Sequence, residues 1–198
     1  MSKAPVVNFL FEAGMLAQTP RSGWQFLGGE QSVAEHINWM MYIVYALASM
    51  QTEKVDLQKC LSMCLFHDFA EARTGDLNYV NQQYVHADET RALEDAVRDL
   101  PFGEDICALL IEYEVRETVE AQLVKDADNL EFLLSLKERF DAGNKVAALS
   151  QDRTRERLTT LAAKQLYDAI IETDSWSWWD QLSVSQHEAR LARGGKKG

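Results

Sequence analysis

The sequence predicts an all-α fold. Only three prolines and ten glycines occur among 198 residues, so few positions would interrupt a helix. Apolar residues recur at spacings of three and four, the pattern of helices with one buried face. No repeat, low-complexity tract or composition shift divides the chain, so we expect one domain over residues 1–198. Its core would span about 9–140, with C-terminal helices over about 150–191 and a frayed tail over 192–198.

The formal net charge of −11 argues against a nucleic-acid polymer as partner, because neutralising phosphates requires clustered Lys and Arg. It does not exclude a small anionic substrate, since a metal and one or two arginines can reverse the charge locally. No apolar run approaches the roughly 18 residues that a membrane-spanning helix needs. The N-terminus also lacks a signal-peptide pattern, and we therefore expect a cytoplasmic protein.

Residues 6–16 carry apolar side chains at helical spacing and predict a first helix that ends near position 17. The segment 18–24 then interrupts it with a proline and a glycine. In this loop, Arg21 offers the planar fork of donors that suits phosphate, and Trp24 offers a flat stacking surface. The alternative is a surface arginine beside a tryptophan that plugs the core.

A second helix is predicted to begin after Ser32, because Glu35 three residues later completes a capping box. Its apolar stripe for core packing consists of Val33, Ile37, Met40, Met41, Val44 and Leu47. His36 lies in the first turn. A lone histidine there is either structural or solvated, or it is a ligand if other helices bring a metal site to it.

Asp56 can cap the next predicted helix, which runs through position 73. Cys60 and Cys64 lie four residues apart on one face of it. With the histidine three residues further on they could form a soft metal site, but buried cysteine commonly packs as a small hydrophobic residue, as we expect here. Cys107 is alone, and an odd number of cysteines without extracellular features indicates no disulfide framework.

Near its end this helix delivers His67 beside Asp68. A buried charged pair is costly unless it is compensated, and a divalent cation commonly compensates histidine beside aspartate. Glu71 would share their helix face, while Gly75 suits the helix C-terminus and Asp76 would lie on the loop just outside. These residues indicate either a compact acidic metal centre or a buried His–Asp salt bridge.

Residues 77–83 are polar and irregular, which predicts a loop over a cleft. Helical patterning resumes over 84–100, where we expect His86 to be exposed. A break at Pro101–Gly103 separates this segment from another predicted helix over 104–114.

The segment 123–134 is an apolar helix interrupted by two aspartates, Asp126 and Asp128. An aspartate among buried positions either pairs with a cation or ligates a metal. Lys125, Asp128 and Glu131 are three apart and share a face. Spacing alone does not choose between the two aspartates.

The C-terminal part follows a turn at 141–144, and we expect one helix over 155–171 and another over roughly 178–191. Three tryptophans, Trp176, Trp178 and Trp179, cluster between them. We expect these tryptophans to pack a terminal helix rather than to stack on a ligand.

The order of His36, His67–Asp68 and Asp128 resembles the H…HD…D motif of the HD-domain metal-dependent phosphohydrolases. Longer segments, within about residues 9–136, look like the 5′-deoxynucleotidase-type branch of that family. These segments are Thr19–Trp24, Ser32–His36, His67–Leu77 and Val124–Glu131. A glutamate three residues after HD, with T-G-D beyond it, is far more specific than a bare HD. The resemblance implies a single HD-domain helical bundle.

By this resemblance the metal ligands are His36, His67, Asp68 and Asp128. The family pattern K-x-x-D-x-x-E selects Asp128 over Asp126. Glu71 matches the residue that handles the catalytic proton, and Asp76 matches one near the substrate and its attacking water. Arg21 matches the phosphate-binding arginine. Trp24 fits an R-x-G-W form of the substrate loop, although in some relatives the tryptophan directly follows the arginine.

The resemblance therefore implies a metal-dependent phosphomonoesterase that hydrolyses (deoxy)nucleoside 5′-monophosphates to nucleoside and phosphate. It implies one divalent ion, and the sequence does not choose among Co²⁺, Mn²⁺, Zn²⁺, Fe²⁺, Ni²⁺ and Mg²⁺. Relatives in the family are dimeric, and the aromatic C-terminus could supply a homodimer interface. Neither the preferred base nor the preferred sugar can be inferred from the residues.

Two alternatives remain at this point. One is another HD-type phosphohydrolase, acting on a cyclic nucleotide, a nucleoside triphosphate or a ppGpp-like alarmone. A larger substrate would call for more Lys and Arg than segments 18–36 and 67–84 offer. The other is a non-catalytic nucleotide-binding helical protein, against which the retention of all four ligands with Glu71 and Asp76 speaks.

Overall fold

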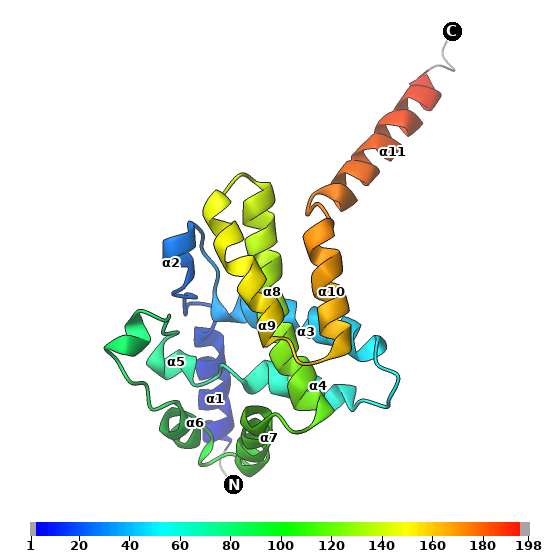
Figure 1. Cartoon of the computed structure of the whole chain (residues 1–198). Coiled ribbons are helices and arrows are strands. Elements are labelled where there is room, and N and C mark those ends of the chain that lie inside the picture. The colour runs from blue at the N-terminus through cyan, green and yellow to red at the C-terminus, as the bar shows by residue number, and fades with distance from the viewer. Residues whose placement is uncertain (1–2, 195–198) are drawn as a thin grey trace.

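The computed structural model describes residues 3–194, with only the backbone described at 25–26, 148–152, 187 and 189–194. These residues form helices joined by loops, with an isolated bridge between Pro20 and Ser32 (Figure 1). The predicted all-α class is confirmed. Within this part of the chain we find no helix with the length and apolarity that a bilayer crossing requires.

The helices differ widely in length, and α8 is the longest. In chain order they are α1 (Ala4–Met15), α2 (Trp24–Leu27), α3 (Val33–Ser49), α4 (Leu57–Phe66), α5 (Glu71–Thr74), η1 (Asn81–Gln83), α6 (Glu89–Val97), α7 (Gly103–Val115), α8 (Val119–Asp141), η2 (Lys145–Ser150), α9 (Gln151–Arg157), α10 (Leu161–Glu172) and α11 (Ser177–Gly194).

The core is organised around α8, which packs against α3, α4, α7, α9 and α10 (Figure 1). Residues on more than one face of α8 are therefore buried, among them Ala121, Leu123 and Val124. The apolar stripe of α3, including Met40 and Leu47, packs into the same cluster. Any charged side chain on these helices must find partners inside the molecule, because unpaired burial of charge is costly.

The predicted helix starts follow from local capping chemistry. The Ser32 hydroxyl accepts from the Glu35 amide, and the Glu35 carboxylate accepts from the Ser32 amide, which completes the capping box of α3. The Asp56 side chain caps α4 by accepting from the amide of Lys59.

The predicted helix from Asp56 through position 73 is interrupted, and the expectation of one continuous helix is wrong. α4 ends at Phe66, and the chain turns more tightly before α5 begins at Glu71. In these turns, amides bond to carbonyls three residues back, as in the bond from Glu71 N to the Asp68 carbonyl at 3.1 Å. His67 and Asp68 lie in this connection between α4 and α5.

Two further helices are shorter than predicted. The segment 84–88 lies outside α6, which begins at Glu89 after a cap by Asp88, and His86 is exposed as expected. The predicted helix over 155–171 is split into α9 and α10. The split follows from Asp126, which lies in the core and accepts hydrogen bonds from the chain between those helices.

The C-terminal helix α11 projects away from the other helices (Figure 1). Trp176, Trp178 and Trp179 are 57%, 60% and 58% exposed, so the expectation that they pack against the rest of the chain is wrong. The expected frayed tail over 192–198 is helical as far as Gly194, and 195–198 lie outside the described residues.

Candidate metal centre and substrate cleft

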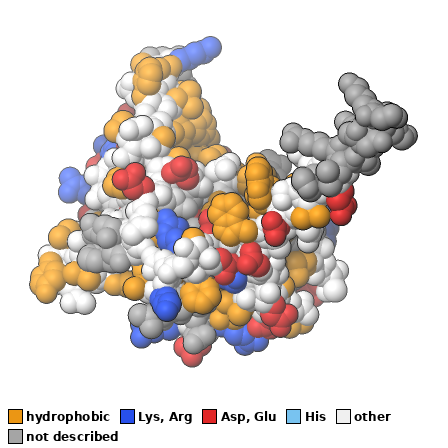
Figure 2. Space-filling model, turned by 90° about the horizontal axis from the view of Figure 1, so that it is seen from above, with side chains coloured by type: hydrophobic (Ala, Val, Ile, Leu, Met, Phe, Trp, Pro, Cys, Tyr) orange, Lys and Arg blue, Asp and Glu red, His pale blue; other side chains and the backbone are white. Residues whose placement is uncertain are grey.

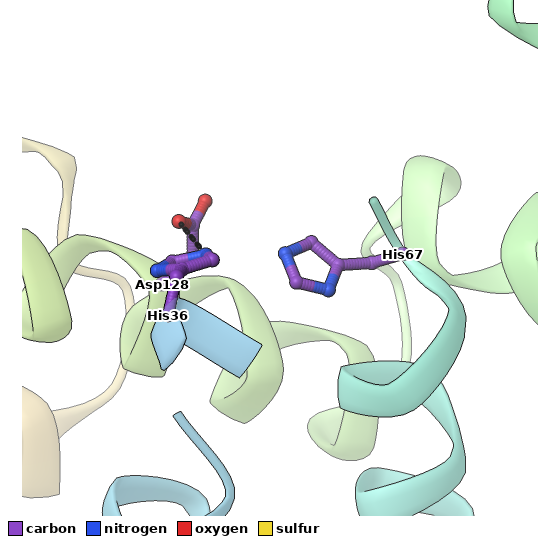
Figure 3. Close-up of side chains that lie close together, drawn as sticks. All are labelled: His36, His67 and Asp128. Atoms are coloured by element: carbon purple, nitrogen blue, oxygen red, sulfur yellow. Dashed lines mark ion pairs between the residues drawn. The ribbon is translucent and has the colours of Figure 1, made fainter. Parts of the chain in front are cut away.

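Three helices bring the predicted metal ligands together. His36 comes from the first turn of α3, His67 from the C-cap of α4 and Asp128 from the middle of α8 (Figure 3). One ligand atom from each lies within 4.8 Å of the other two. Asp68 joins them, because its Oδ2 is 3.1 Å from His67 Nε2 and 3.5 Å from His36 Nε2. All four side chains predicted as ligands therefore converge.

Both imidazoles are oriented by a hydrogen bond on the far side of the ring. His36 Nδ1 donates to Glu131 Oε2 at 2.7 Å, and His67 Nδ1 donates to the Cys64 carbonyl at 2.9 Å. These bonds leave each Nε2 facing the centre with its lone pair. Both Nε2 atoms are buried and lack a hydrogen-bond partner among the described residues.

This donor set fits a divalent cation. A buried nitrogen without a partner costs free energy, and a bound cation removes that cost for both imidazoles. Two imidazoles and two carboxylates also suit several divalent transition metals, with two carboxylate charges to balance the ion. The geometry therefore favours a metal centre over a simple His–Asp salt bridge.

The electrostatics keep the two carboxylates ionised. Burial opposes ionisation of Asp68, but the neighbouring His67 and His36 lower its pKa to about 2. Burial likewise opposes ionisation of Asp128, yet Lys125 and the two histidines hold its pKa far below the usual value. Lys125 Nζ donates to Asp128 Oδ2 at 2.7 Å. Both aspartates therefore carry the charge that a metal ligand needs at neutral pH.

The structure separates the two aspartates of α8. Asp126 is fully buried and accepts hydrogen bonds from the amides of Thr159 and Thr160 and from the Thr160 hydroxyl, at 2.7–2.8 Å. Its oxygens are thereby committed to the start of α10. Asp128 alone faces the histidines, in agreement with the choice that the family pattern implies.

The cysteines lie outside the metal centre. Cys60 and Cys64 are fully buried in the core cluster beside Met63, and burial raises the pKa of Cys60 to about 12. Neutral thiols are poor metal ligands. The expectation that they pack as small hydrophobic residues is confirmed.

Sequence reasoning assigned no site role to Glu131 and overlooked Gln31. Glu131 is fully buried between His36 and Gln31, whose Nε2 donates to Glu131 Oε1 at 2.6 Å. Gln31 Oε1 in turn accepts from Trp24 Nε1 at 2.6 Å. The spacing of Lys125, Asp128 and Glu131 was the available signal for Glu131. Nothing local in the sequence indicates Gln31.

Trp24 lies in the wall of the site rather than on its surface. The residue is 2% exposed, and Arg139 lies over its ring with the guanidinium carbon 4.0 Å from the centroid. Phe132 packs against it as well. The alternative of a tryptophan that plugs the core therefore describes its packing, although Trp24 also lines the cleft described below.

Arg21 is held above the metal centre. Its side chain is 17% exposed, and Nη1 lies 3.6 Å from Asp68 Oδ2. Burial disfavours its charge, but the carboxylates of Asp68 and Asp128 raise its pKa. A cation of fixed charge thus stands between the metal centre and solvent.

Glu71 and Asp76 stand on either side of Gly75, whose φ of 72° favours glycine because it has no Cβ. Burial raises the pKa of Glu71 to about 9, with further contributions from the charges of Asp68 and Asp76. Glu71 Oε2 is buried without a hydrogen-bond partner in the described chain. Asp76 Oδ2 accepts from the Ser22 amide at 2.6 Å, which ties the loop after α5 to the Arg21 loop.

These side chains open into a cleft of about 610 Å³. That volume lies within the range of about 300–1,000 Å³ typical of small-molecule sites. The lining includes Arg21, Trp24, Asp68, Glu71, Asp76, Leu77, Tyr79, Arg116, Lys125, Asp128, Asn129, Phe132, Arg153 and Arg157. Of the residues predicted from sequence, His36 is fully buried and His67 lines a neighbouring pocket, and the others contribute to this lining.

The chain matches a known family. The family model for the HD domain matches residues 13–168, from within α1 to within α10. The 5′-deoxynucleotidase HDDC2 of Mus musculus is 30% identical over 156 residues, which cover 75% of this chain and 76% of that protein. The 5′-deoxynucleotidase hdd1 of Schizosaccharomyces pombe is 32% identical over 157 residues, which cover 74% and 78%.

Solved structures show a similar fold. A conserved hypothetical protein from Pyrococcus furiosus superimposes with a TM-score of 0.70 at 25% identity. The superposition covers 84% of this chain and 99% of that protein.

Proposed function

The chain belongs to the HD-domain family of metal-dependent phosphohydrolases, and on that premise we propose that it hydrolyses (deoxy)nucleoside 5′-monophosphates to nucleoside and phosphate. One observation carries the proposal. Two buried Nε2 atoms without partners, from His36 and His67, face two ionised carboxylates beneath a cleft that holds Arg21. The two relatives above, both named 5′-deoxynucleotidases, support the substrate class.

His36, His67, Asp68 and Asp128 would hold one divalent ion. The chemistry that such an ion supplies when bound is acidification of a water molecule and neutralisation of charge on the phosphate oxygens. Co²⁺, Mn²⁺, Zn²⁺, Fe²⁺, Ni²⁺ and Mg²⁺ all remain candidates, because cellular occupancy depends on availability as well as on ligand type.

Arg21 would bind the phosphate. Its guanidinium offers five N–H donors in a planar fork, and charge-assisted hydrogen bonds to phosphate oxygens are about twice as strong as neutral ones. The side chain is already held in the cleft by the charge of Asp68. Little rotamer freedom is therefore lost when the substrate binds.

Glu71 would supply the proton for the leaving group. With a pKa of about 9 its carboxyl is protonated at neutral pH. When the bond between phosphorus and O5′ breaks, this proton passes to O5′ and the nucleoside leaves as a neutral alcohol. Asp76, fixed through Ser22, would orient the substrate and the attacking water from the opposite side of Gly75.

Phosphate release from a panel of nucleoside 5′-monophosphates tests the proposal. The protein is stripped of metal and resupplied separately with Co²⁺, Mn²⁺, Zn²⁺ or Mg²⁺. We expect release with metal that is absent in His67→Ala and retained in His86→Ala, a matched variant of an exposed histidine. No release from any monophosphate by the metal-loaded protein would overturn the proposal. Cyclic nucleotides, triphosphates and alarmones would be assayed next.

We further propose that the protein is a cytoplasmic homodimer without a nucleic-acid or membrane partner. Its three cysteines are free thiols, as is usual in a reducing compartment. Basic, acidic and hydrophobic side chains are interspersed on the face in Figure 2, unlike the basic stripe of a nucleic-acid surface. The exposed tryptophans of the α11 region would supply the dimer interface. A monomer in light scattering after size exclusion would contradict the dimer.

A further inference from the structure

One wall of the cleft carries two arginines that the proposed reaction does not use. Arg153 and Arg157 lie four residues apart on α9, so they share a helix face, and both line the cleft. Arg155 does not line the cleft, and its Nε donates to Asp168 Oδ1 at 3.0 Å. In a chain with a net charge of −11, two basic residues directed into one cleft call for an explanation.

Arg157 is joined to the loop that crosses from the metal centre. Its Nη1 donates to the Tyr79 hydroxyl at 2.7 Å, and its guanidinium carbon lies 5.6 Å from the centroid of the Tyr79 ring. Tyr79 follows Asp76 by three residues, and Asn78 between them donates to the Ser22 carbonyl at 3.4 Å. Tyr79 therefore lies on a loop that is anchored beside Arg21, the proposed phosphate-binding residue. Tyr79 is 67% exposed.

The lining of the cleft is mixed in polarity. Its acidic residues, Asp68, Glu71, Asp76 and Asp128, surround the metal centre. Trp24, Leu27 and Phe132 form an apolar group, and the α9 arginines with Tyr79 form a third group of the same lining. A nucleotide with its phosphate at Arg21 and the metal centre would place its sugar and base in the rest of this cleft, where Tyr79 and α9 are available to the base.

We propose that Tyr79, Arg153 and Arg157 form a base subsite that favours guanine over adenine. This inference rests on the proposed function and adds its preferred base. The Tyr79 ring offers a stacking surface for any base. Arginine side chains only donate hydrogen bonds, and guanine presents two acceptors, O6 and N7, where adenine presents one acceptor and one donor. The bond to Tyr79 occupies one of the five N–H donors of Arg157 and leaves the others for the base.

The test compares dGMP with dAMP in metal-loaded protein, as kcat/KM for phosphate release. We expect the wild type to favour dGMP. Because a bidentate arginine–guanine contact discriminates by ~5- to 150-fold, Arg157→Gln should lower kcat/KM for dGMP about tenfold, mainly through KM. For dAMP the same variant should not lower kcat/KM, because a glutamine side chain can pair with the N6 and N7 edge of adenine. Arg155→Gln is the matched control on the same helix, and we expect it to change neither value.

A second readout separates this inference from the proposed function. Nucleotide-induced shifts of the melting temperature, with metal present, report binding whether or not turnover occurs. Larger shifts by dGMP than by dAMP, lost in Arg157→Gln, would support the subsite even if no phosphate were released. Equal handling of both nucleotides by the wild type would overturn the inference while leaving the nucleotidase activity intact. An equal loss for both nucleotides in Arg157→Gln would do the same.

Discussion

Two aspartates of α8 lie two residues apart and serve two different parts of the molecule. Asp126 is fully buried, and its two oxygens accept three hydrogen bonds from Thr159 and Thr160. Asp128 faces the opposite way, toward the unpartnered Nε2 atom of His36 at 3.5 Å. The first cluster is complete within the protein, whereas the second needs a cation to become complete. The partners distinguish the two carboxylates: Asp126 accepts from amides and a hydroxyl of the chain, whereas Asp128 faces a buried imidazole nitrogen that has no hydrogen-bond partner in the described chain.

The largest expected effect comes from replacing the charged side chain of Asp128 with a neutral one. Asp128→Asn removes one of the two charges that balance the ion, so we expect loss of the metal and phosphate release at background level. Folding should be retained, because asparagine keeps an acceptor for the one partly buried hydrogen bond from Lys125 that the charge supports. Metal content of the purified variant, measured beside its circular dichroism spectrum, checks both points. A variant with normal metal content and turnover would remove Asp128 from the centre.

The next effect separates binding of the metal from handling of the proton. Glu71→Ala removes the proposed proton donor but none of the four ligands, so metal content should stay at the wild-type level while kcat falls by ~10²–10⁴. Glu94→Ala, at an exposed position of α6, is the control for loss of a carboxylate. Full activity in Glu71→Ala would show that another group supplies the proton.

Glu131 extends the metal centre into the core. Glu131→Gln keeps an acceptor for His36 Nδ1 but removes the charge behind the ring, and we expect metal affinity to fall by ~10–100-fold. Ser135→Ala is the milder comparison, because it removes only the hydroxyl that donates to Glu131 Oε1 at 3.2 Å. Titration of metal-free protein with Zn²⁺ measures both affinities. Equal affinities in the two variants would reduce Glu131 to a packing residue.

Asp126 should show the reverse pattern. Asp126→Asn leaves amide hydrogens where the chain before α10 presents its own donors, and each lost buried hydrogen bond costs ~1–3 kcal/mol. We expect a melting temperature lower by ~2–4 °C for each kcal/mol, with metal content unchanged. Loss of metal in this variant, at a temperature where it is folded, would make Asp126 part of the site.

The sequence signals that succeeded were local. The Ser32–Glu35 capping box, the Asp56 cap and the spacing of the HD segment each depend on residues within one or two turns. Which of Asp126 and Asp128 faces the metal centre depends on the helix that packs against each face of α8. The residues by themselves therefore do not choose between the two aspartates. Gln31 bonds to a residue 100 positions away, a contact that no single-chain pattern reveals. The end of α4 at Phe66 was also missed, because the sequence favoured an unbroken helix there.

The smallest expected effect is a dependence of the free energy of unfolding on pH, and it arises from the carboxyl of Glu71. In metal-free protein its pKa is about 9, whereas the unfolded chain has the ordinary value of 4.5. Between pH 6 and 9 the folded state therefore holds a proton that the unfolded state has released. The free energy of unfolding must then fall as pH rises, by at most about 1.4 kcal/mol per pH unit for one proton.

Other titratable groups near the metal centre do not reverse this fall of the unfolding free energy with rising pH. Asp68 has a pKa of about 2 and that of Asp128 is also depressed, so both are ionised in either state above pH 6 and contribute a constant. Asp68 raises the pKa of His67 despite burial, which adds a slope of the same sign. Urea unfolding at pH 6, 7, 8 and 9 in the presence of a chelator should therefore give a shallower fall for Glu71→Gln than for the wild type. Identical slopes would mean that Glu71 is ionised in the folded protein at neutral pH, which would remove it as the proton donor.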